Sequence, residues 1–248
     1  MCTLALGFRL DRRWPVLVAA NRDEHLDRPT EGWALRGGAS GEALRATPLD
    51  RRAGGTWIGV SARGVFAGLT NHYLRFDGYP DPTRRSRGEL VERALAAPGA
   101  AAAAEALRPL DPALWNPFHL VVADSEGAFL LWYDGEERGL LELGPGLHVV
   151  TETDREGRGA RGDLIRARWP ADPTLPRLRD LLVQHGALPP AGAATCIHGD
   201  PLYGTRSSAI LRLAPDLAAS ELYVAEARPC IAPHEDRSDL LLALSRRA

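Results

Sequence analysis

The sequence predicts an α+β fold with antiparallel sheets inside and helices outside. Apolar runs at 3–10 and 14–20, and again at 56–61 and 65–71, are separated by short polar turns, as in hairpins. The run "PVLVAA" at 15–20 is apolar at every position, which indicates a strand covered on both faces. The order of predicted elements is paired strands, two helices, further strands, one or two helices and a last strand pair. Strands and helices do not alternate in this order, as they would in a doubly wound fold.

Length and composition narrow the class of protein. The 248 residues are expected to form a single domain over 1–248. A net charge of −2 argues against a nucleic-acid or anionic-lipid partner. All 30 basic residues are arginine, a bias typical of a GC-rich bacterial genome. Three cysteines make no disulfide framework, and we find neither a secretory leader nor about 18 consecutive apolar residues for a membrane span. A cytoplasmic location is expected.

Two helices are predicted after the second hairpin. The stretch "SRGELVERALAA" at 86–97 has capping-box spacing between Ser86 and Glu89, followed by an apolar stripe at helical spacing. The alanine run at 100–104 predicts a second helix through alanine's propensity, with a low-complexity linker as the alternative.

The rest of the chain returns to strands. Turn residues separate strand-like segments, then come two amphipathic helical segments and a closing hairpin. The predicted strands are 118–124, 128–134, 139–143 and 147–151, the helices 163–169 and 175–185, and the hairpin 207–213 with 221–227.

Cys2 is the first candidate for chemistry. Removal of Met1 would leave a thiol and a free α-amine on one residue. An α-amine has a pKa of about 7.7–8.0, suited to accepting a proton near neutrality and so to activating its own thiol. The alternative, which position alone favours, is that Cys2 is a small buried apolar residue of the first strand.

The tetrapeptide "NRDE" follows the second apolar run. If the first two strands pair around a tight turn, residues 21–24 run past the start of the first strand and lie beside Cys2. Alternation then places Asn21 and Asp23 on one face and Arg22 and Glu24 on the other. We expect Asp23 to bond or orient the amine and Asn21 to donate to a substrate oxygen. The alternative is a charged turn that leaves the sheet.

Two further segments carry candidates. Asn71 ends an apolar strand, where its amide could stabilise an oxyanion or simply form a turn. The segment "CIHGDPLYGTRSS" holds Tyr203 and Arg206, whose guanidinium could clamp an anion. Cys196 and His198 are two metal-ligand types without partners nearby in sequence, so no metal site is predicted.

Five motifs in order resemble the NRDE family, also called the transport and Golgi organisation protein 2 family. They are "MCTLALGF", "AANRDE", "GGTWIGVSARGVFAGLTN", "SRGELV" and "YGTRSS", and they span 1–91 and 195–213. The resemblance implies a four-layer αββα sandwich like that of the N-terminal nucleophile hydrolases. By analogy with choloylglycine hydrolase and penicillin V acylase, it implies Cys2 as nucleophile with its amine as base, Asp23 beside it, Asn71 in the oxyanion hole and Arg206 as a late active-site arginine.

Two departures from those hydrolases bear on activity. Their Arg-Asn-x-Asp pattern is matched here at Asn21 and Asp23, but the arginine is displaced to Arg22, on the opposite strand face. Where they carry an asparagine on a middle strand, this chain has Glu152 in "VVTETD". If Glu152 faces the site, its charge would oppose thiolate formation.

The resulting hypotheses differ in class. The first is a cysteine N-terminal nucleophile hydrolase that cleaves a non-peptide amide C–N bond of a small molecule and requires no cofactor. The alternative, which the family resemblance implies, is a non-catalytic carrier of haem or an acyl-chain metabolite. It would use a deep apolar pocket, arginines for the propionates, and iron ligands from Cys2, His25, His72 or His198. On either hypothesis Arg22, His72, His198 and Tyr203 are candidate binding residues. A partner-binding domain ranks last, because buried polar strand ends are costly without a use.

Overall fold

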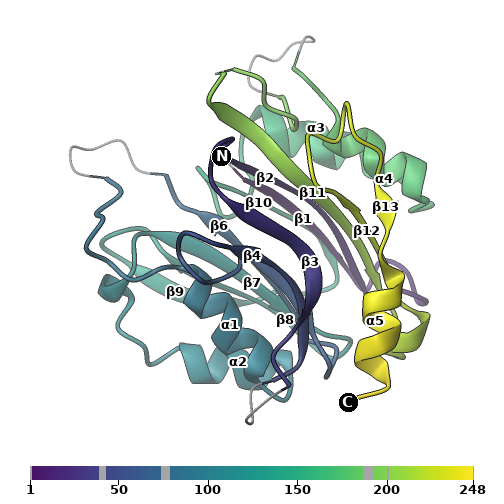
Figure 1. The fold of residues 1–248 in the computed structure, drawn as a ribbon, viewed down its shortest axis with the longest axis horizontal. Coiled ribbons are helices and arrows are strands. Elements are labelled where there is room, and N and C mark those ends of the chain that lie inside the picture. Colours follow the sequence, from purple (N-terminus) through teal and green to yellow (C-terminus); the bar gives the residue numbers. More distant parts are fainter. Residues whose placement is uncertain (1, 39–42, 74–78, 187–192, 200, 248) are drawn as a thin grey trace.

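Two antiparallel sheets face each other and carry helices on their outer sides, as Figure 1 shows. The computed structural model describes residues 2–38, 43–73, 79–186, 193–199 and 201–247. Contacts of two helices with each sheet complete four layers in the order α, β, β, α. The predicted α+β sandwich is therefore confirmed.

The first sheet contains the first two family motifs, in β1 and β2, and the last one, in β11. Its strand order is β10 (Gly146–Thr151), β1 (Thr3–Phe8), β2 (Val16–His25), β11 (Tyr203–Leu213), β12 (Glu221–Ala225) and β13 (Glu235–Asp236). The outer helices are α3 (Ala160–Arg168) and α4 (Leu175–Leu182). Both predicted hairpins in this sheet, β1 with β2 and β11 with β12, are confirmed by their antiparallel registers.

The second sheet follows the chain order. It contains β3 (Thr30–Arg36), β4 (Arg45–Asp50), β5 (Ile58–Ser61), β6 (Phe66–Asn71), β7 (Phe118–Ala123), β8 (Ala128–Tyr133) and β9 (Arg138–Glu142). The helices α1 (Gly88–Ala96) and α2 (Ala100–Leu107) pack on it. Short helical turns are η1 (Pro112–Leu114) and η2 (Leu217–Ala219), and α5 (Ser238–Ser245) packs against η2 and β12. The sequence did not predict β3, β4, β13 or α5.

Three apolar layers hold the sandwich together. One lies between the sheets, and one lies under each helix pair. Val18 faces the layer between the sheets, whereas its neighbour Ala19 faces α3 and α4. A strand buried on both faces has no polar side, so it does not alternate. This arrangement explains the unbroken apolar run of β2.

The strand β2 continues through "NRDE" to His25, because β11 pairs with it as far as Tyr203 opposite His25. The expected alternation of 21–24 is therefore confirmed, and the alternative of a charged turn that leaves the sheet is wrong. One local expectation was also wrong. The capping box of α1 does not form. Arg87 occupies the N-cap without a side-chain bond, and the Glu89 carboxylate pairs instead with Arg85 and Arg93.

Within the described residues, no helix is both long and apolar enough to cross a membrane.

Candidate functional site

Cys2 lies where the sequence placed it, beside the "NRDE" segment. Thr3 pairs with Asn21, so the residue before Thr3 lies next to the continuation of β2. The Cys2 thiol donates to the main-chain oxygen of Asp23 across 3.8 Å. The Tyr203 hydroxyl donates to the same oxygen at 3.2 Å. The predicted proximity of Cys2 to 21–24 is confirmed.

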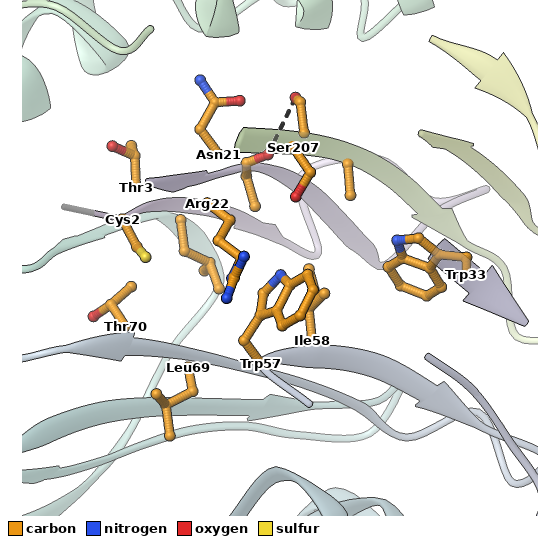
Figure 2. A pocket seen from close by; sticks show the side chains of 14 residues that line it. Cys2, Thr3, Asn21, Arg22, Trp33, Trp57, Ile58, Leu69, Thr70 and Ser207 are labelled. Atoms are coloured by element: carbon orange, nitrogen blue, oxygen red, sulfur yellow. Dashed lines mark hydrogen bonds between the residues drawn. The ribbon is translucent and has the colours of Figure 1, made fainter. Parts of the chain in front are cut away.

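Alternation along β2 divides this neighbourhood into two sides. Cys2 and Arg22 line a cleft between the two sheets, together with Trp57 and Thr70, as Figure 2 shows. Asn21 and Asp23 bond to segments on the other side of the strand, near α4 and the start of β11. The thiol therefore lies on the Arg22 side of β2, and the Asp23 carboxyl lies behind it.

Arg22 is the cation of the cleft. Its guanidinium lies 4.0 Å from the centre of the Trp57 ring and 3.4 Å from the Glu24 carboxylate, and the residue is buried. Burial raises the pKa of the Cys2 thiol above its ordinary value, and the positive charge of Arg22 opposes that rise. In this surrounding the thiol needs a base before it can act as a nucleophile.

Asp23 is a buried carboxyl with an unusual affinity for protons. Burial raises its pKa to about 7, against the opposing hydrogen bond from the Thr205 hydroxyl. A carboxyl that titrates near neutrality can both accept and donate a proton there.

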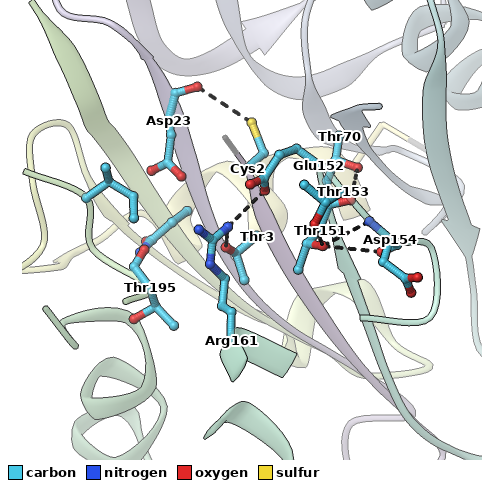
Figure 3. Close-up of polar contacts among 12 residues, drawn as sticks. Cys2, Thr3, Asp23, Thr70, Thr151, Glu152, Thr153, Asp154, Arg161 and Thr195 are labelled. Atoms are coloured by element: carbon cyan, nitrogen blue, oxygen red, sulfur yellow. Dashed lines mark hydrogen bonds and ion pairs between the residues drawn. The ribbon is translucent and has the colours of Figure 1, made fainter. Parts of the chain in front are cut away.

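Glu152 faces the same side as Asp23, and it is paired. Its carboxylate lies 2.8 Å from Nη1 of Arg161, and both side chains are buried. Arg161 also donates to the Thr3 hydroxyl at 3.3 Å and to the main-chain oxygen of Ala194 at 2.8 Å. Figure 3 shows Arg161 reaching from α3 toward Glu152 and Thr3. Sequence reasoning missed Arg161, because no motif distinguishes it from the other arginines nearby.

Asn21 has no amide hydrogen left for a substrate in this conformation. Its Nδ2 donates to the main-chain oxygens of Leu182 and Thr195, each at 2.8 Å. The side chain thereby ties β2 to the end of α4 and to the loop before β11. Its placement suits positioning the strand rather than the predicted donation to a substrate oxygen.

Asn71 and Thr70 end β6 on opposite faces. Thr70 lines the cleft that holds Cys2, and its hydroxyl bonds to the main-chain oxygen of Thr151 at 3.4 Å. Asn71 is half-buried and is absent from the cleft lining. The chemical role predicted for Asn71 stays a prediction, and sequence reasoning did not single out Thr70.

The other candidate residues lie in separate surroundings. Arg206 is the extra residue of a β-bulge in β11, next to the Thr205–Asp23 pair. The His72 ring lies 4.6 Å from the ring of buried His119. His198 contacts Cys196 and Cys230. Bulges commonly re-aim a side chain near a functional site.

The cleft at Cys2 is narrow. The volume open to a water molecule is about 20 Å³, room for roughly one water. A larger cavity of about 520 Å³ lies instead against β7–β9 and α2. The residues that line this larger cavity include no histidine or cysteine. Neither space is the deep pocket with an iron ligand that a haem carrier was expected to show.

Comparison with known proteins gives the family. The sequence model of "Transport and Golgi organisation 2" matches residues 1–162. The chain belongs to the Transport and Golgi organisation 2 family.

Mammalian members of the Transport and Golgi organisation 2 family are similar over 55% of this chain. The mouse homologue is 34% identical over 142 residues, 55% of this chain and 50% of that protein. The human homologue is 33% identical over 141 residues, again 55% of this chain and 50% of that protein. The chain thus spans about half the length of the curated relatives it matches.

Solved structures with the same fold as this Transport and Golgi organisation 2 member are N-terminal nucleophile hydrolases. A Caenorhabditis elegans N-acylethanolamine-hydrolyzing acid amidase orthologue has a TM-score of 0.57 at 13% identity, covering 85% of this chain and 92% of that chain. Penicillin V acylase from Agrobacterium tumefaciens has a TM-score of 0.56 at 14% identity, covering 100% and 89%. Conjugated bile acid hydrolase from Clostridium perfringens, as its C2A mutant, has a TM-score of 0.53 at 10% identity, covering 95% and 96%. At these identities the likeness shows the fold alone.

Proposed function

We propose that the protein is a cysteine hydrolase of the N-terminal nucleophile type, which cleaves a non-peptide amide C–N bond with Cys2. The observation that supports this most is the position of the Cys2 thiol. It lines the cleft between the sheets, with Arg22 in the same cleft and the main chain of Asp23 in contact. A nucleophile without a base is weak, and the α-amine of Cys2 would supply the base once Met1 is removed.

The reaction follows from these groups. The α-amine takes the thiol proton, and the sulfur attacks the substrate carbonyl carbon. The tetrahedral intermediate then expels the amine, which receives the proton, and a thioester remains on Cys2. Water, activated by the α-amine, cleaves the thioester and releases the carboxylic acid. The pKa of Asp23 is raised to about 7 by burial, and on this proposal its carboxyl would respond to the charge of the amine during these proton transfers.

The cleft also bears on the substrate. Trp33, Trp57 and Leu69 line it, so we expect an apolar or aromatic acyl group beside the thiol. The space is narrow, so an extended acyl chain requires movement of the lining side chains. The proteins of similar fold act on N-acylethanolamines, penicillin V and conjugated bile acids according to their names, and these amides are the first substrates to test.

The test combines mass and turnover. Intact mass should show that Met1 is removed, because retention of Met1 would block the amine and overturn the mechanism. The full-length protein should release amine from penicillin V, an N-acylethanolamine or a glycine-conjugated bile acid. Cys2→Ala should abolish release, and Arg63→Ala in an exposed turn should not change it. Equal turnover by Cys2→Ala and the unchanged protein would refute the proposal.

Carriage of haem or an acyl-chain metabolite is the competing hypothesis, and the same variants examine it. A saturable haem spectrum with one haem per chain, weakened in Cys2→Ala and accompanied by no amide turnover, would favour the carrier. An unsaturable haem response would reject it.

A further inference from the structure

Two connections of the first sheet meet at one place beside the candidate site. They are the connection from α4 to β11, in its described parts 183–186 and 193–199, and the loop between β12 and β13. They bring together His185, Cys196, His198 and Cys230, whose ligand atoms all lie within 4.8 Å of one another. These four residues, which we call the four-ligand cluster, are the only such group of three or more ligand-type residues in the part of the chain that the structure describes.

The spacing within the four-ligand cluster resembles that of ligands around one ion. The two sulfurs are 3.6 Å apart, and Nε2 of His198 lies 3.5 Å from Sγ of Cys196 and 3.1 Å from Sγ of Cys230. For tetrahedral zinc, with Zn–S of about 2.3 Å and Zn–N of about 2.0–2.1 Å, the ligand edges are about 3.8 Å between sulfurs and about 3.5 Å between sulfur and nitrogen. The fourth group, His185, has its ring 4.6 Å from the ring of His198.

A disulfide accounts for the cluster less well. A bonded pair of sulfurs is about 2.05 Å apart, far closer than the 3.6 Å between Cys196 and Cys230. A disulfide would also leave no reason for two imidazoles to converge on the same sulfurs. Two thiolates and two neutral imidazoles, in contrast, form one of the common donor sets for Zn²⁺ and balance its charge.

We propose that His185, Cys196, His198 and Cys230 bind one Zn²⁺ ion in a tetrahedral structural site. Four protein ligands leave no coordination position for water or substrate, so the ion stabilises loops rather than catalysing a reaction. Binding displaces the two thiol protons and forms two Zn–S and two Zn–N bonds, with no change of oxidation state.

The position of the four-ligand cluster connects the ion to Asp23. Its ligands Cys196 and His198 flank Ile197, whose main-chain nitrogen donates to the Thr205 hydroxyl at 2.8 Å. Thr205 in turn donates to the Asp23 carboxyl. A bound ion would thus hold the loop that fixes Asp23. The zinc site itself is independent of the proposed hydrolysis.

The test measures metal directly. The full chain, purified without chelator, should contain one zinc per chain by elemental analysis, and cobalt substitution should give the visible spectrum of tetrahedral thiolate-bound Co²⁺. Cys230→Ser, His198→Gln and His185→Gln should each lower the zinc content at least several-fold. Cys2→Ser and His148→Gln, which change a cysteine and a histidine outside the cluster, should retain it.

Opposite outcomes overturn the proposal. One is a zinc content well below one per chain that does not rise on adding Zn²⁺, with no cobalt thiolate spectrum. The other is a metal-free protein whose mass and peptide map show a bond between Cys196 and Cys230. Cobalt titration of the unsubstituted protein does not depend on any variant, so the proposal remains falsifiable even if Cys230→Ser fails to fold.

Discussion

Arg161 and Glu152 form a buried ion pair with 2.8 Å between Nη1 and the carboxylate, and their side chains are only 11% and 4% exposed. The pair answers a question that the sequence raised, because an unpaired Glu152 would place a negative charge beside the candidate site. The charge of Arg161 lowers the pKa of Asp23, and that of Glu152 raises it. Arg161 therefore neutralises much of the effect of Glu152 on Asp23.

Removing one partner of this pair should destabilise the protein strongly. Arg161→Met leaves Glu152 buried without its cation and should lower the free energy of unfolding by about 3–5 kcal/mol. Adding Glu152→Gln should recover part of the loss, because the buried charge is then gone. Urea unfolding measures both. Arg158→Met, in a pair where the arginine is 74% exposed, should change stability by less than about 0.5 kcal/mol. A small effect of Arg161→Met would contradict this account.

The raised pKa of Asp23 predicts a pH dependence of stability. Its folded-state pKa of about 7 exceeds the ordinary value of 3.8, so the folded protein binds this proton more tightly than the unfolded chain. Between about pH 4 and pH 7 this group should therefore lower the free energy of unfolding as pH rises, by up to about 1.4 kcal/mol per pH unit. The loss levels off about one pH unit above the folded-state pKa, at about pH 8.

Asp23→Asn should remove that dependence. The amide oxygen can still accept the Thr205 hydroxyl, but it carries no charge. The difference in free energy of unfolding between Asp23→Asn and the unchanged protein should grow in favour of the variant from pH 4.5 to pH 8 in urea titrations. Subtraction is needed because His119 and His234, with pKa values lowered by burial, add slopes of their own. A difference that stays constant with pH would show that Asp23 is not buried as described.

Sequence alone predicted the features that depend on local pairing. The strands β1 and β2 follow each other in the chain through a short loop at 9–15 and pair with Phe8 opposite Val16, so the proximity of Cys2 to "NRDE" followed from the pattern of apolar residues. Alternation also separated Arg22 from Asn21 and Asp23 correctly. It could not tell which of the two faces borders the cleft, because that depends on how the second sheet packs against the first.

Contacts between segments far apart in the chain could not be predicted from the sequence. Thr205 reaches Asp23 across 182 positions, and Cys230 reaches Cys196 across 34. Neither separation matches a known ligand or catalytic spacing. The strand β3 was missed because it is only half-buried and so lacks a clear apolar period.

The two sheets approach each other closely at Gly68, near the cleft. A methyl group added there would lie 2.5 Å from Cδ1 of Leu4 and 2.8 Å from the ring of Phe66. Gly68→Ala should therefore overpack the layer between the sheets and lower the free energy of unfolding by about 1–3 kcal/mol. Gly144→Ala is the matched control, because nothing lies within 4 Å of the added carbon. Equal stability of the two variants in urea unfolding would argue against the close approach.

Arg22 should contribute to the reactivity of Cys2. Its positive charge lowers the pKa of the thiol, against the larger effect of burial. Arg22→Met should therefore raise that pKa and slow the alkylation of Cys2 by iodoacetamide at pH 8. Arg22→Lys keeps the charge and should retain most of the rate, and Arg63→Met, in an exposed turn, should retain all of it. Peptide mass spectrometry separates labelling of Cys2 from that of Cys196 and Cys230. If Arg22→Met and Arg63→Met react equally fast at every pH, the guanidinium does not act on the thiol and the cleft is not organised around Cys2.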